Sequence, residues 1–367
     1  GGFRIGLTAL GGRCVFASEI DPFASAAYAR NFGDNGHLHG DITEVPNEAI
    51  PPHDILTAGF PCQSFSRAGE RGGLGDARGD LFHEIIRFAA TRRPKVLILE
   101  NVPNLLRCDN GHALHTIVTL LTETGYHVRL QLLNATAVVP QHRERLFLVC
   151  FRSDLSTAAK KFKWPTFPAA RQKSLRDVLD QEVQPLGKYR LTPSQWALVR
   201  ASHDYKKCAE WRLAQVDERG EARTLRGSYR KSFARFSEFV PLREDGRLRE
   251  PLASSSLSSA AVMPPEENGE EEGEEAAGGC AAEEENDDPS VECCGDAGGA
   301  VPPAPRFYTE RECARLQGFP DSYILEGPKQ YTQLGNAVNP LLVEAIGRCV
   351  LQALEEEEAS PREKRIG

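Results

Sequence analysis

A cysteine with reactive potential, Cys62, stands between a proline and a glutamine in the stretch Gly59-Phe60-Pro61-Cys62-Gln63-Ser64. The apolar residues 54–58 before it read as a buried strand, so Cys62 is expected where a parallel strand ends, the edge at which open α/β sheets carry out chemistry. A thiolate is a good nucleophile when polar neighbours lower its pKa. The alternative is a buried structural cysteine, the commoner fate of a free thiol and our interpretation of Cys14, which lies in an apolar run. The glycine, proline and polar neighbours of Cys62 favour the nucleophile.

A carboxyl group is expected at the same edge. Glu100 follows the apolar run Val96-Leu97-Ile98-Leu99, which reads as a second strand. Burial at the mouth of an apolar strand raises the pKa of a carboxyl, which lets it act as a general acid near neutral pH. A thiol and an acid together suit attack on a ring carbon whose neighbouring nitrogen is protonated. The alternative for Glu100 is a carboxylate paired with a nearby arginine.

Two arginines alternate in Gln141-His142-Arg143-Glu144-Arg145, just before the apolar run 146–149. In an extended segment Arg143 and Arg145 share a face. Two guanidinium groups on one face can clamp a phosphate or a ring carbonyl. The alternative is a pair of surface salt bridges with Glu144 or another acid.

Acidic residues also follow the first expected strands, at Glu19 and at Asp41, which precedes Ile42. An acidic residue at this edge is the usual partner of a ribose hydroxyl in nucleotide-binding folds. Of the glycine-rich turn that normally accompanies it, only Gly1-Gly2 is present, so this signal is weak by itself.

The elements that position these residues alternate between strand and helix over the first 150 residues. Strands are expected at 14–18, 54–58, 96–99, 128–133 and 146–151, and helices at 21–31, 80–92 and 112–124. Strands separated by helices imply βαβ units with right-handed crossovers. We therefore predict an α/β fold with a Rossmann-like, mostly parallel sheet and helices on both faces.

Composition divides the rest of the chain. Residues 156–252 are basic and less periodic, which predicts a smaller irregular domain, whereas residues 253–305 hold 14 acidic residues and no Lys or Arg. Such a low-complexity segment cannot bury enough apolar surface to fold, and we predict a disordered acidic insertion. The expected organisation is a domain over 1–155, the irregular domain over 156–252, the insertion over 253–305, a return to both folded domains over 306–354 and a charged tail over 355–367.

Charge and cysteine content bound the partners. The net charge of −8 becomes +6 without residues 253–305, and residues 160–250 alone carry +9. A basic surface indicates a polyanionic partner, although a solvated surface without a partner is the alternative. The ten cysteines include no C-x-x-C pair, so we expect no metal site, and scattered thiols favour a reducing intracellular compartment. No apolar run approaches the roughly 20 residues of a membrane helix, so we expect no membrane partner.

Together these motifs resemble the DNA (cytosine-5) methyltransferase family, over about residues 1–250 and 306–352. The resemblance rests on five motifs in the family's order: Gly59-Phe60-Pro61-Cys62-Gln63-Ser64, Glu100-Asn101-Val102, Gln141-x-Arg143-x-Arg145, Arg311-Glu312 through Gln317-x-Phe319-Pro320, and Gly335-Asn336-Ala337-Val338. It implies the methyltransferase version of the predicted fold. It also implies transfer of a methyl group from S-adenosylmethionine to carbon 5 of cytosine in double-stranded DNA, after the base is flipped out.

The resemblance assigns roles to particular positions. Cys62 would add to carbon 6, Glu100 would protonate nitrogen 3, Arg145 would hold the base carbonyl, and Arg143 would support its surroundings. The implied cofactor-binding residues are Phe3, Glu19, Ile20, Asp41, Ile42, Pro61, Leu81, Asn336 and Val338. Residues 156–252 would form the target-recognition domain, and the implied DNA-binding residues are Ser64, Gln141, Thr224, Leu225, Arg226, Tyr229 and Arg230.

One departure concerns the start of the chain. The family opens with a strand and a Phe-x-Gly-x-Gly turn, and this sequence begins at the last two glycines of that turn. We therefore expect this chain to bind the cofactor poorly or to be unstable.

Three other functions were weighed. An RNA (tRNA) cytosine-5 methyltransferase would carry a Cys-Phe-Thr element where this chain has Thr224-Leu225. A catalytically impaired DNA-binding module is suggested by the incomplete first motif. A cysteine protease lacks any local signature for a base beside Cys62. We expect a monomer in the nucleus of a eukaryote, with an organelle as the alternative, or in the cytoplasm of a bacterium.

Overall fold

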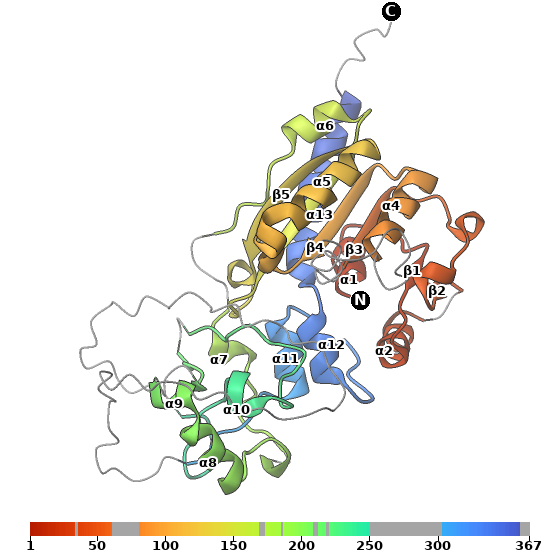
Figure 1. Ribbon diagram of the computed structural model, residues 1–367. Helices are drawn as coiled ribbons and strands as arrows, with labels where there is room; N and C mark the ends of the chain where they lie inside the picture. The colour runs from red at the N-terminus through yellow and green to blue at the C-terminus, as the bar shows by residue number, and fades with distance from the viewer. Residues whose placement is uncertain are drawn as a thin grey trace, which may run out of the picture.

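The computed structural model describes residues 1–33, 36–60, 81–168, 173–184, 186–207, 212–217, 220–249 and 303–359. It has two lobes, which Figure 1 shows one above the other. The sheet lobe holds all six strands of the described residues, and the helical lobe holds helices α7 to α12.

The main sheet has four strands in the order β3-β4-β6-β5. They are β3 (Ile55–Gly59), β4 (Val96–Asn101), β5 (Tyr126–Asn134) and β6 (Glu144–Arg152). β3 is parallel to β4, and β6 is antiparallel to both of its neighbours. Strands β3, β4 and β5 therefore run in one direction, as expected of a mostly parallel sheet, and β6 alone is reversed.

A second, small sheet consists of the parallel strands β1 (Ala17–Ser18) and β2 (Leu38–His39). β1 is much shorter than the strand predicted over 14–18. Helix α2 (Pro22–Phe32) joins the two strands and begins as predicted, because the Asp21 carboxylate accepts hydrogen bonds from the amides of Phe23 and Ala24.

The last two strands, between which no helix was predicted, do not form a βαβ unit. β5 and β6 pair directly and antiparallel, because residues 135–143 between them hold only a 3-10 turn, Ala135–Ala137. A parallel connection needs a crossover of a dozen or more residues, usually a helix.

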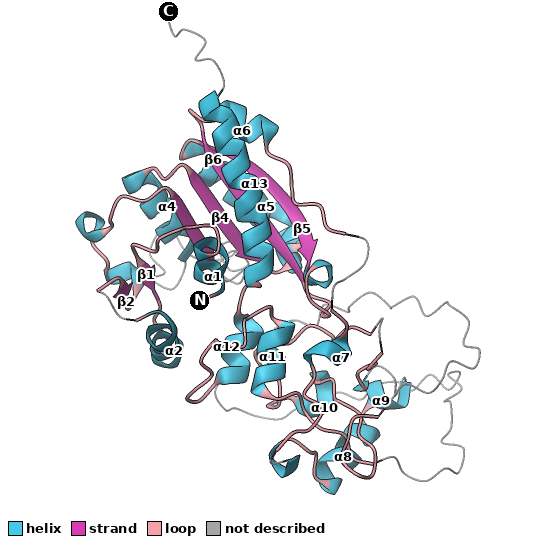
Figure 2. Ribbon diagram, turned by 180° about the vertical axis from the view of Figure 1, so that it is seen from behind, coloured by secondary structure: helices cyan, strands magenta, loops and turns pink. Residues whose placement is uncertain are grey.

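Helices cover both faces of the main sheet (Figure 2). Helices α4 (Leu81–Arg92) and α5 (His112–Glu123) pack on the face that presents Leu97 and Leu99 of β4. Helices α6 (Ser156–Lys161) and α13 (Pro340–Ala359) pack on the face of Val96 and Ile98. Side chains alternate across a strand, so β4 contributes to both cores and is buried along its length.

Helix α1 (Gly2–Thr8), which packs against α13, was not predicted from the sequence. Glycine disfavours helices, so Gly2 and Gly6 weaken the helical pattern of this segment in the sequence. Their small size is what permits the packing. A Cβ atom on Gly2 would lie 2.2 Å from the carbonyl oxygen of Val338, and one on Gly6 would lie 2.6 Å from that of Pro340.

The helical lobe contains α7 (Leu175–Val178), α8 (Pro193–Ala201), α9 (His203–Lys207), α10 (Phe233–Phe236), α11 (Glu310–Leu316) and α12 (Gln330–Asn336). Its core combines residues 175–240 with residues 307–334. Thr309 and Glu312 form the capping box of α11, and both oxygens of Glu312 accept from buried Arg306 at 2.7 Å. Segments on both sides of residues 253–305 thus build one core.

The helical stretch Gln330–Ala359 is long and apolar enough to span a membrane by length and composition, and its most apolar 18-residue window has a mean hydropathy of 1.3. The stretch contains no uninterrupted apolar run of membrane-spanning length, because charged residues such as Glu344 and Arg348 occur within it. Half of its most apolar window is buried inside the protein, and α13 packs against α1 and α6. We interpret it as a core helix.

Candidate active site

Glu100 lies near the end of β4, opposite Gly59 of β3 and Phe147 of β6. Only 13% of its side chain is exposed, and its Oε1 atom lies 3.0 Å from Nε of Arg145. Burial raises the pKa of Glu100, while the charges of Arg145 and Arg143 and the Arg145 hydrogen bond oppose the rise. The predicted burial and raised pKa are confirmed, and the alternative, pairing with an arginine, is present at the same time.

The guanidinium group of Arg143 binds backbone carbonyls of the protein itself, whereas a clamp on a phosphate or a base needs open donors. Its Nη1 donates to the carbonyl of Leu225 at 3.0 Å, and its Nη2 donates to the carbonyls of Gly335 and Ala337 at 2.8 and 2.9 Å. The side chain is buried, and burial lowers its pKa to about 9. These donors bind the main chain of distant segments, so the terminal nitrogens of Arg143 are already used within the protein.

Asn101 has a role that sequence reasoning missed. It is buried next to Glu100, and its Nδ2 donates to the carbonyl of Phe60 at 2.8 Å while its Oδ1 accepts from the Val102 amide at 2.8 Å. Asn101 therefore fixes the chain where β3 leads toward Cys62. The sequence feature that could have indicated this role is the amide side chain of Asn101 directly after Glu100.

Three of the predicted site residues, Pro61, Cys62 and Ser64, lie outside the described residues.

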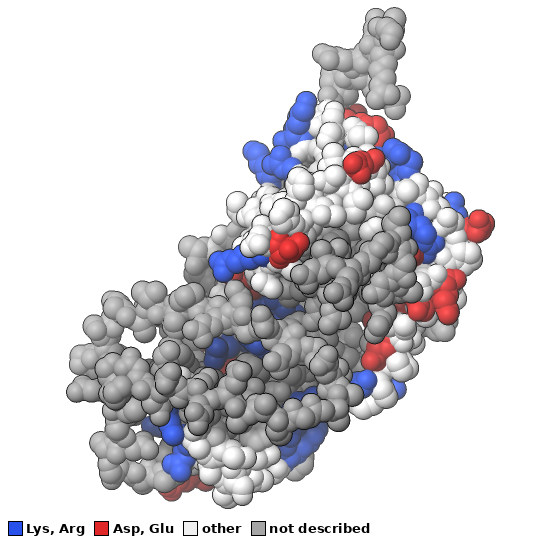
Figure 3. Space-filling view, in the orientation of Figure 1, with Lys and Arg blue, Asp and Glu red and all other residues white. Residues whose placement is uncertain are grey.

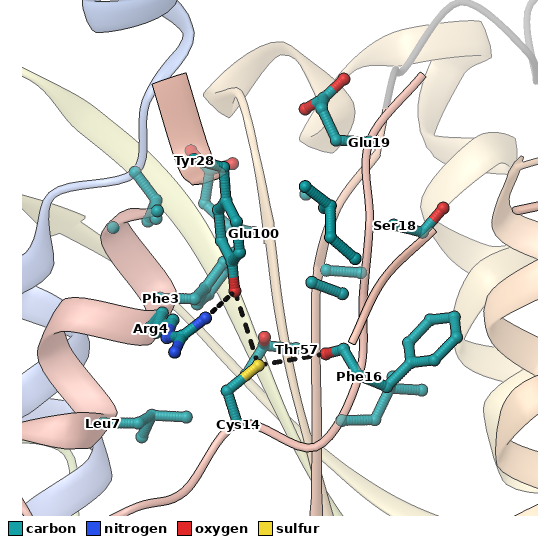
Figure 4. Close-up of a pocket in the computed structure, with 18 of the residues that line it drawn as sticks. Phe3, Arg4, Leu7, Cys14, Phe16, Ser18, Glu19, Tyr28, Thr57 and Glu100 are labelled. Carbon is teal, nitrogen blue, oxygen red and sulfur yellow. Dashed lines mark hydrogen bonds between the residues drawn. The ribbon is translucent and has the colours of Figure 1, made fainter. Parts of the chain in front are cut away.

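A cavity of about 2550 Å³ opens beside Glu100 (Figure 4). Its walls include β1 and β3, strands of different sheets, and the start of α1. All eight described residues predicted to bind the cofactor line it: Phe3, Glu19, Ile20, Asp41, Ile42, Leu81, Asn336 and Val338. The cavity is larger than the roughly 300–1,000 Å³ of most ligand sites.

The polar groups of the cavity are held in place by the main chain. Oδ1 of Asp41 accepts from the amide and the hydroxyl of Thr43 at 2.9 and 2.8 Å, and these bonds lower the pKa of Asp41. Glu19 accepts from the Asp21 amide at 2.9 Å. Ile20 beside them is 70% exposed. This arrangement suits a nucleoside, because the fixed carboxylates can accept hydrogen bonds from ribose hydroxyls and the exposed apolar side chain can pack against the flat base.

Sequence reasoning also missed a polar group at the cavity wall. Arg4 donates to the hydroxyl of Tyr28 at 2.9 Å, and the Sγ atom of Cys14 lies 3.5 Å from the same oxygen (Figure 4). Burial raises the pKa of Tyr28 to about 12, so it stays protonated. The interpretation of Cys14 as a buried structural thiol is wrong, since it is only partly buried and lines the cavity.

Several residues predicted to bind DNA are buried or hydrogen-bonded inside the protein. Gln141 is fully buried, Leu225 is buried, and the Thr224 hydroxyl donates to the His142 carbonyl at 2.7 Å. Tyr229 is buried in the helical lobe, where its hydroxyl donates to the Glu238 carbonyl at 2.9 Å. Gln141, Leu225 and Tyr229 are therefore not exposed in this structure, and their contact with DNA stays a prediction.

The two remaining arginines reach the surface. Arg226 is exposed, and Arg230 is partly exposed with its guanidinium 4.8 Å from the ring centroid of Phe307. Lys and Arg side chains appear on both lobes in Figure 3, and acidic side chains lie at the top of the sheet lobe as well as near β1 and β2. Among the described residues, no group of three or more His, Cys, Asp or Glu side chains could hold a metal ion.

Comparison with solved structures defines the class of fold. The chain resembles the Dnmt2 methyltransferase of S. pombe, with a TM-score of 0.60 and 18% identity over 98% of this chain and 97% of that one. It also resembles a putative DNA modification methyltransferase of an E. coli prophage, with a TM-score of 0.58 and 18% identity over 97% of each chain. At this identity the likeness shows the fold, a methyltransferase fold of the α/β class.

Sequence comparison identifies the family. The family described as C-5 cytosine-specific DNA methylase matches residues 1–352. The chain is 30% identical to the Type II methyltransferase M.DsaV of Dactylococcopsis salina over 100% of this chain and 87% of the relative, and 33% identical to M.HpaII of Haemophilus parainfluenzae over 96% and 87%. It is 41% identical to M.HhaI of Haemophilus parahaemolyticus over 51% of this chain and 56% of that relative, so this alignment spans about half of each. The chain belongs to the C-5 cytosine-specific DNA methylase family.

Proposed function

We propose that this protein transfers a methyl group from S-adenosylmethionine to carbon 5 of cytosine in double-stranded DNA, through base flipping and a covalent adduct with Cys62. The observation that carries the proposal is the buried Glu100 with a raised pKa, held by Arg145 where β4 opens into a large cavity. A neutral carboxyl in that position can give a proton to a ring nitrogen. The family membership supports the substrate class.

The proposed reaction begins with two coupled events. The thiolate of Cys62 adds to carbon 6 as Glu100 gives its proton to nitrogen 3, which makes carbon 5 electron-rich. When bound, S-adenosylmethionine would supply an electrophilic methyl group. Carbon 5 takes this methyl group with that electron pair as the carbon–sulfur bond breaks, and neutral S-adenosylhomocysteine leaves. Loss of the carbon 5 proton to water then restores the double bond and releases Cys62 as a thiolate, and nitrogen 3 returns its proton to Glu100. Arg145 keeps Glu100 oriented and, by proposal, donates to the base carbonyl.

The cavity fits the methyl donor by its chemistry. We assign Glu19 to the ribose hydroxyls and Asp41 with Ile42 to the adenine, with Phe3, Leu81, Asn336 and Val338 completing the pocket. The fit rests on fixed acceptors at Glu19 and Asp41 beside exposed Ile20, in a cavity that also reaches Glu100.

The decisive test uses duplex DNA with 5-fluorocytosine in place of cytosine, incubated with the protein and S-adenosylmethionine. Fluorine cannot leave as a proton does, so the adduct persists and is visible on a denaturing gel. We expect an adduct that is absent with Cys62→Ser and retained with Cys108→Ser, a cysteine on a 3-10 turn outside the cavity lining. Absence of the adduct from the unaltered protein, at S-adenosylmethionine concentrations high enough to saturate even a weak site, would refute the proposal.

Two arms of the same experiment separate the alternatives. An adduct with 5-fluorocytosine tRNA instead of DNA would favour the RNA methyltransferase. DNA binding without any adduct would favour the impaired binding module.

The domain limits, the recognition role of residues 156–252, the intracellular location and the monomeric state stay predictions.

A further inference from the structure

Residues 222–227, which we call the bridging segment, join the two lobes. The carbonyl of Ala222 accepts from the amide of His142 in the sheet lobe at 2.8 Å. At the other end, the carbonyl of Gly227 accepts from the Thr332 hydroxyl on α12 at 3.0 Å. The segment is therefore held between the start of β6 and α12.

Arg143 connects this segment to the wall of the cavity. It donates to the Leu225 carbonyl within the bridging segment at 3.0 Å. Its other terminal nitrogen donates to the carbonyls of Gly335 and Ala337 at 2.8 and 2.9 Å. Those two residues flank Asn336, which lines the cavity. One guanidinium group thus fixes the backbone on both sides of a cavity residue.

The bridging segment is in close backbone contact with Gly335. A Cβ atom on Gly335 would lie 2.4 Å from the carbonyl carbon of Arg226 and from the nitrogen of Gly227, so the two backbones touch. Arg143 is 2% exposed. Close-packed interiors of this kind transmit displacement rather than absorb it. A shift of the bridging segment must therefore move Gly335 or break its contacts.

We propose that Arg143 is a positioning residue that couples DNA binding by the helical lobe to binding of the methyl donor in the cavity. The proposal rests on the function proposed above. DNA held by the helical lobe shifts or fixes the bridging segment, and Arg143 passes that constraint to the backbone around Asn336. Coupling between two sites is reciprocal, so the donor should tighten or weaken DNA binding by the same factor.

The test measures binding rather than turnover. The dissociation constant of S-adenosylhomocysteine, a donor that has lost its methyl group, is determined by calorimetry with and without sheared plasmid DNA. We expect DNA to change it by about 5–150-fold in the unaltered protein and by less than about twofold in Arg143→Lys. Lysine keeps the charge but presents a single nitrogen, which cannot replace the fork of a guanidinium.

Arg212→Lys is the matched control. Arg212 is also fully buried and donates to main-chain carbonyls of the helical lobe, those of Ser237 at 2.9 Å, Ala234 at 3.0 Å and Phe233 at 2.6 Å. This variant should lose stability comparably and keep the coupling. If the coupling survives in Arg143→Lys, or is lost equally in both variants, the coupling inference is overturned and the proposed function stands. The same conclusion follows if the unaltered protein binds DNA and S-adenosylhomocysteine without coupling between them. If the unaltered protein binds neither ligand, both the coupling inference and the proposed function are overturned.

Discussion

Replacing Glu238 by glutamine should abolish a large part of the pH dependence of stability between about pH 5 and about pH 8. Glu238 is 7% exposed, and its Oε2 accepts from the Tyr308 hydroxyl at 2.7 Å and from the amide of Arg223, in the bridging segment, at 3.1 Å. Burial raises its pKa to about 7, although both hydrogen bonds and the Arg223 charge oppose the rise. The carboxyl is therefore neutral in the folded protein at mildly acidic pH.

The sign and size follow from proton linkage. Between 4.5, its ordinary value, and about 7, the folded protein holds a proton that the unfolded chain has lost. The free energy of unfolding therefore falls as pH rises through this window and levels off above it. One pKa unit corresponds to about 1.4 kcal/mol, so the full effect is about 3 kcal/mol, of which about 2–3 kcal/mol falls between about pH 5 and about pH 8. Glutamine cannot ionise and lacks this term.

Urea unfolding followed by tryptophan fluorescence at both pH values measures the difference, because Trp196 is buried in the same core. Glu310→Gln serves as the control. Burial raises the pKa of Glu310, but hydrogen bonds from Tyr189 and Lys188 lower it by more, so the net shift is downward. The stability that Glu310 contributes is therefore lost only as pH falls below the ordinary pKa of a glutamate. Equal pH dependence in the unaltered protein and in Glu238→Gln would refute the reasoning.

Three further outcomes are expected. Glu100→Gln should slow formation of the 5-fluorocytosine adduct by about 100-fold or more, because an amide cannot give a proton to nitrogen 3 of the ring. Its DNA affinity in a filter-binding assay should change little. Asn101→Ala should cost about 1–3 kcal/mol in urea unfolding by leaving the Phe60 carbonyl without its 2.8 Å donor. Unchanged stability would show that this bond is not needed. Gly335→Ala should cost about 1–3 kcal/mol or more, since its Cβ would lie 2.4 Å from the Gly227 nitrogen. A thermal melt identical to that of the unaltered protein would contradict it.

The features that the sequence predicted well are those encoded over a few neighbouring residues. The apolar run before Glu100 placed it at a strand end and predicted its raised pKa. Asp21 with Pro22 predicted the start of α2. Side-chain periodicity and capping act within one or two turns, so a single sequence reports them.

The motifs likewise indicated a cavity lined by residues far apart in the chain, but only through resemblance to a family. Physical pattern alone gave an acid, a thiol and a pair of arginines without a substrate. The family match over residues 1–352 supplied the class of reaction.

Only the tertiary structure decided what Arg143 and Tyr229 do. The partners of Arg143 lie 82 to 194 residues away along the chain, and Tyr229 donates to a carbonyl inside a core built from both sides of residues 253–305. A local pattern reports that arginine or tyrosine is present but not whether distant carbonyls surround it. The same limit applies to α1, where glycine opposes a helix locally and is required by the close approach of Val338. Sequence thus determined which groups stand at the strand ends, and long-range packing determined which of them remain open to a ligand.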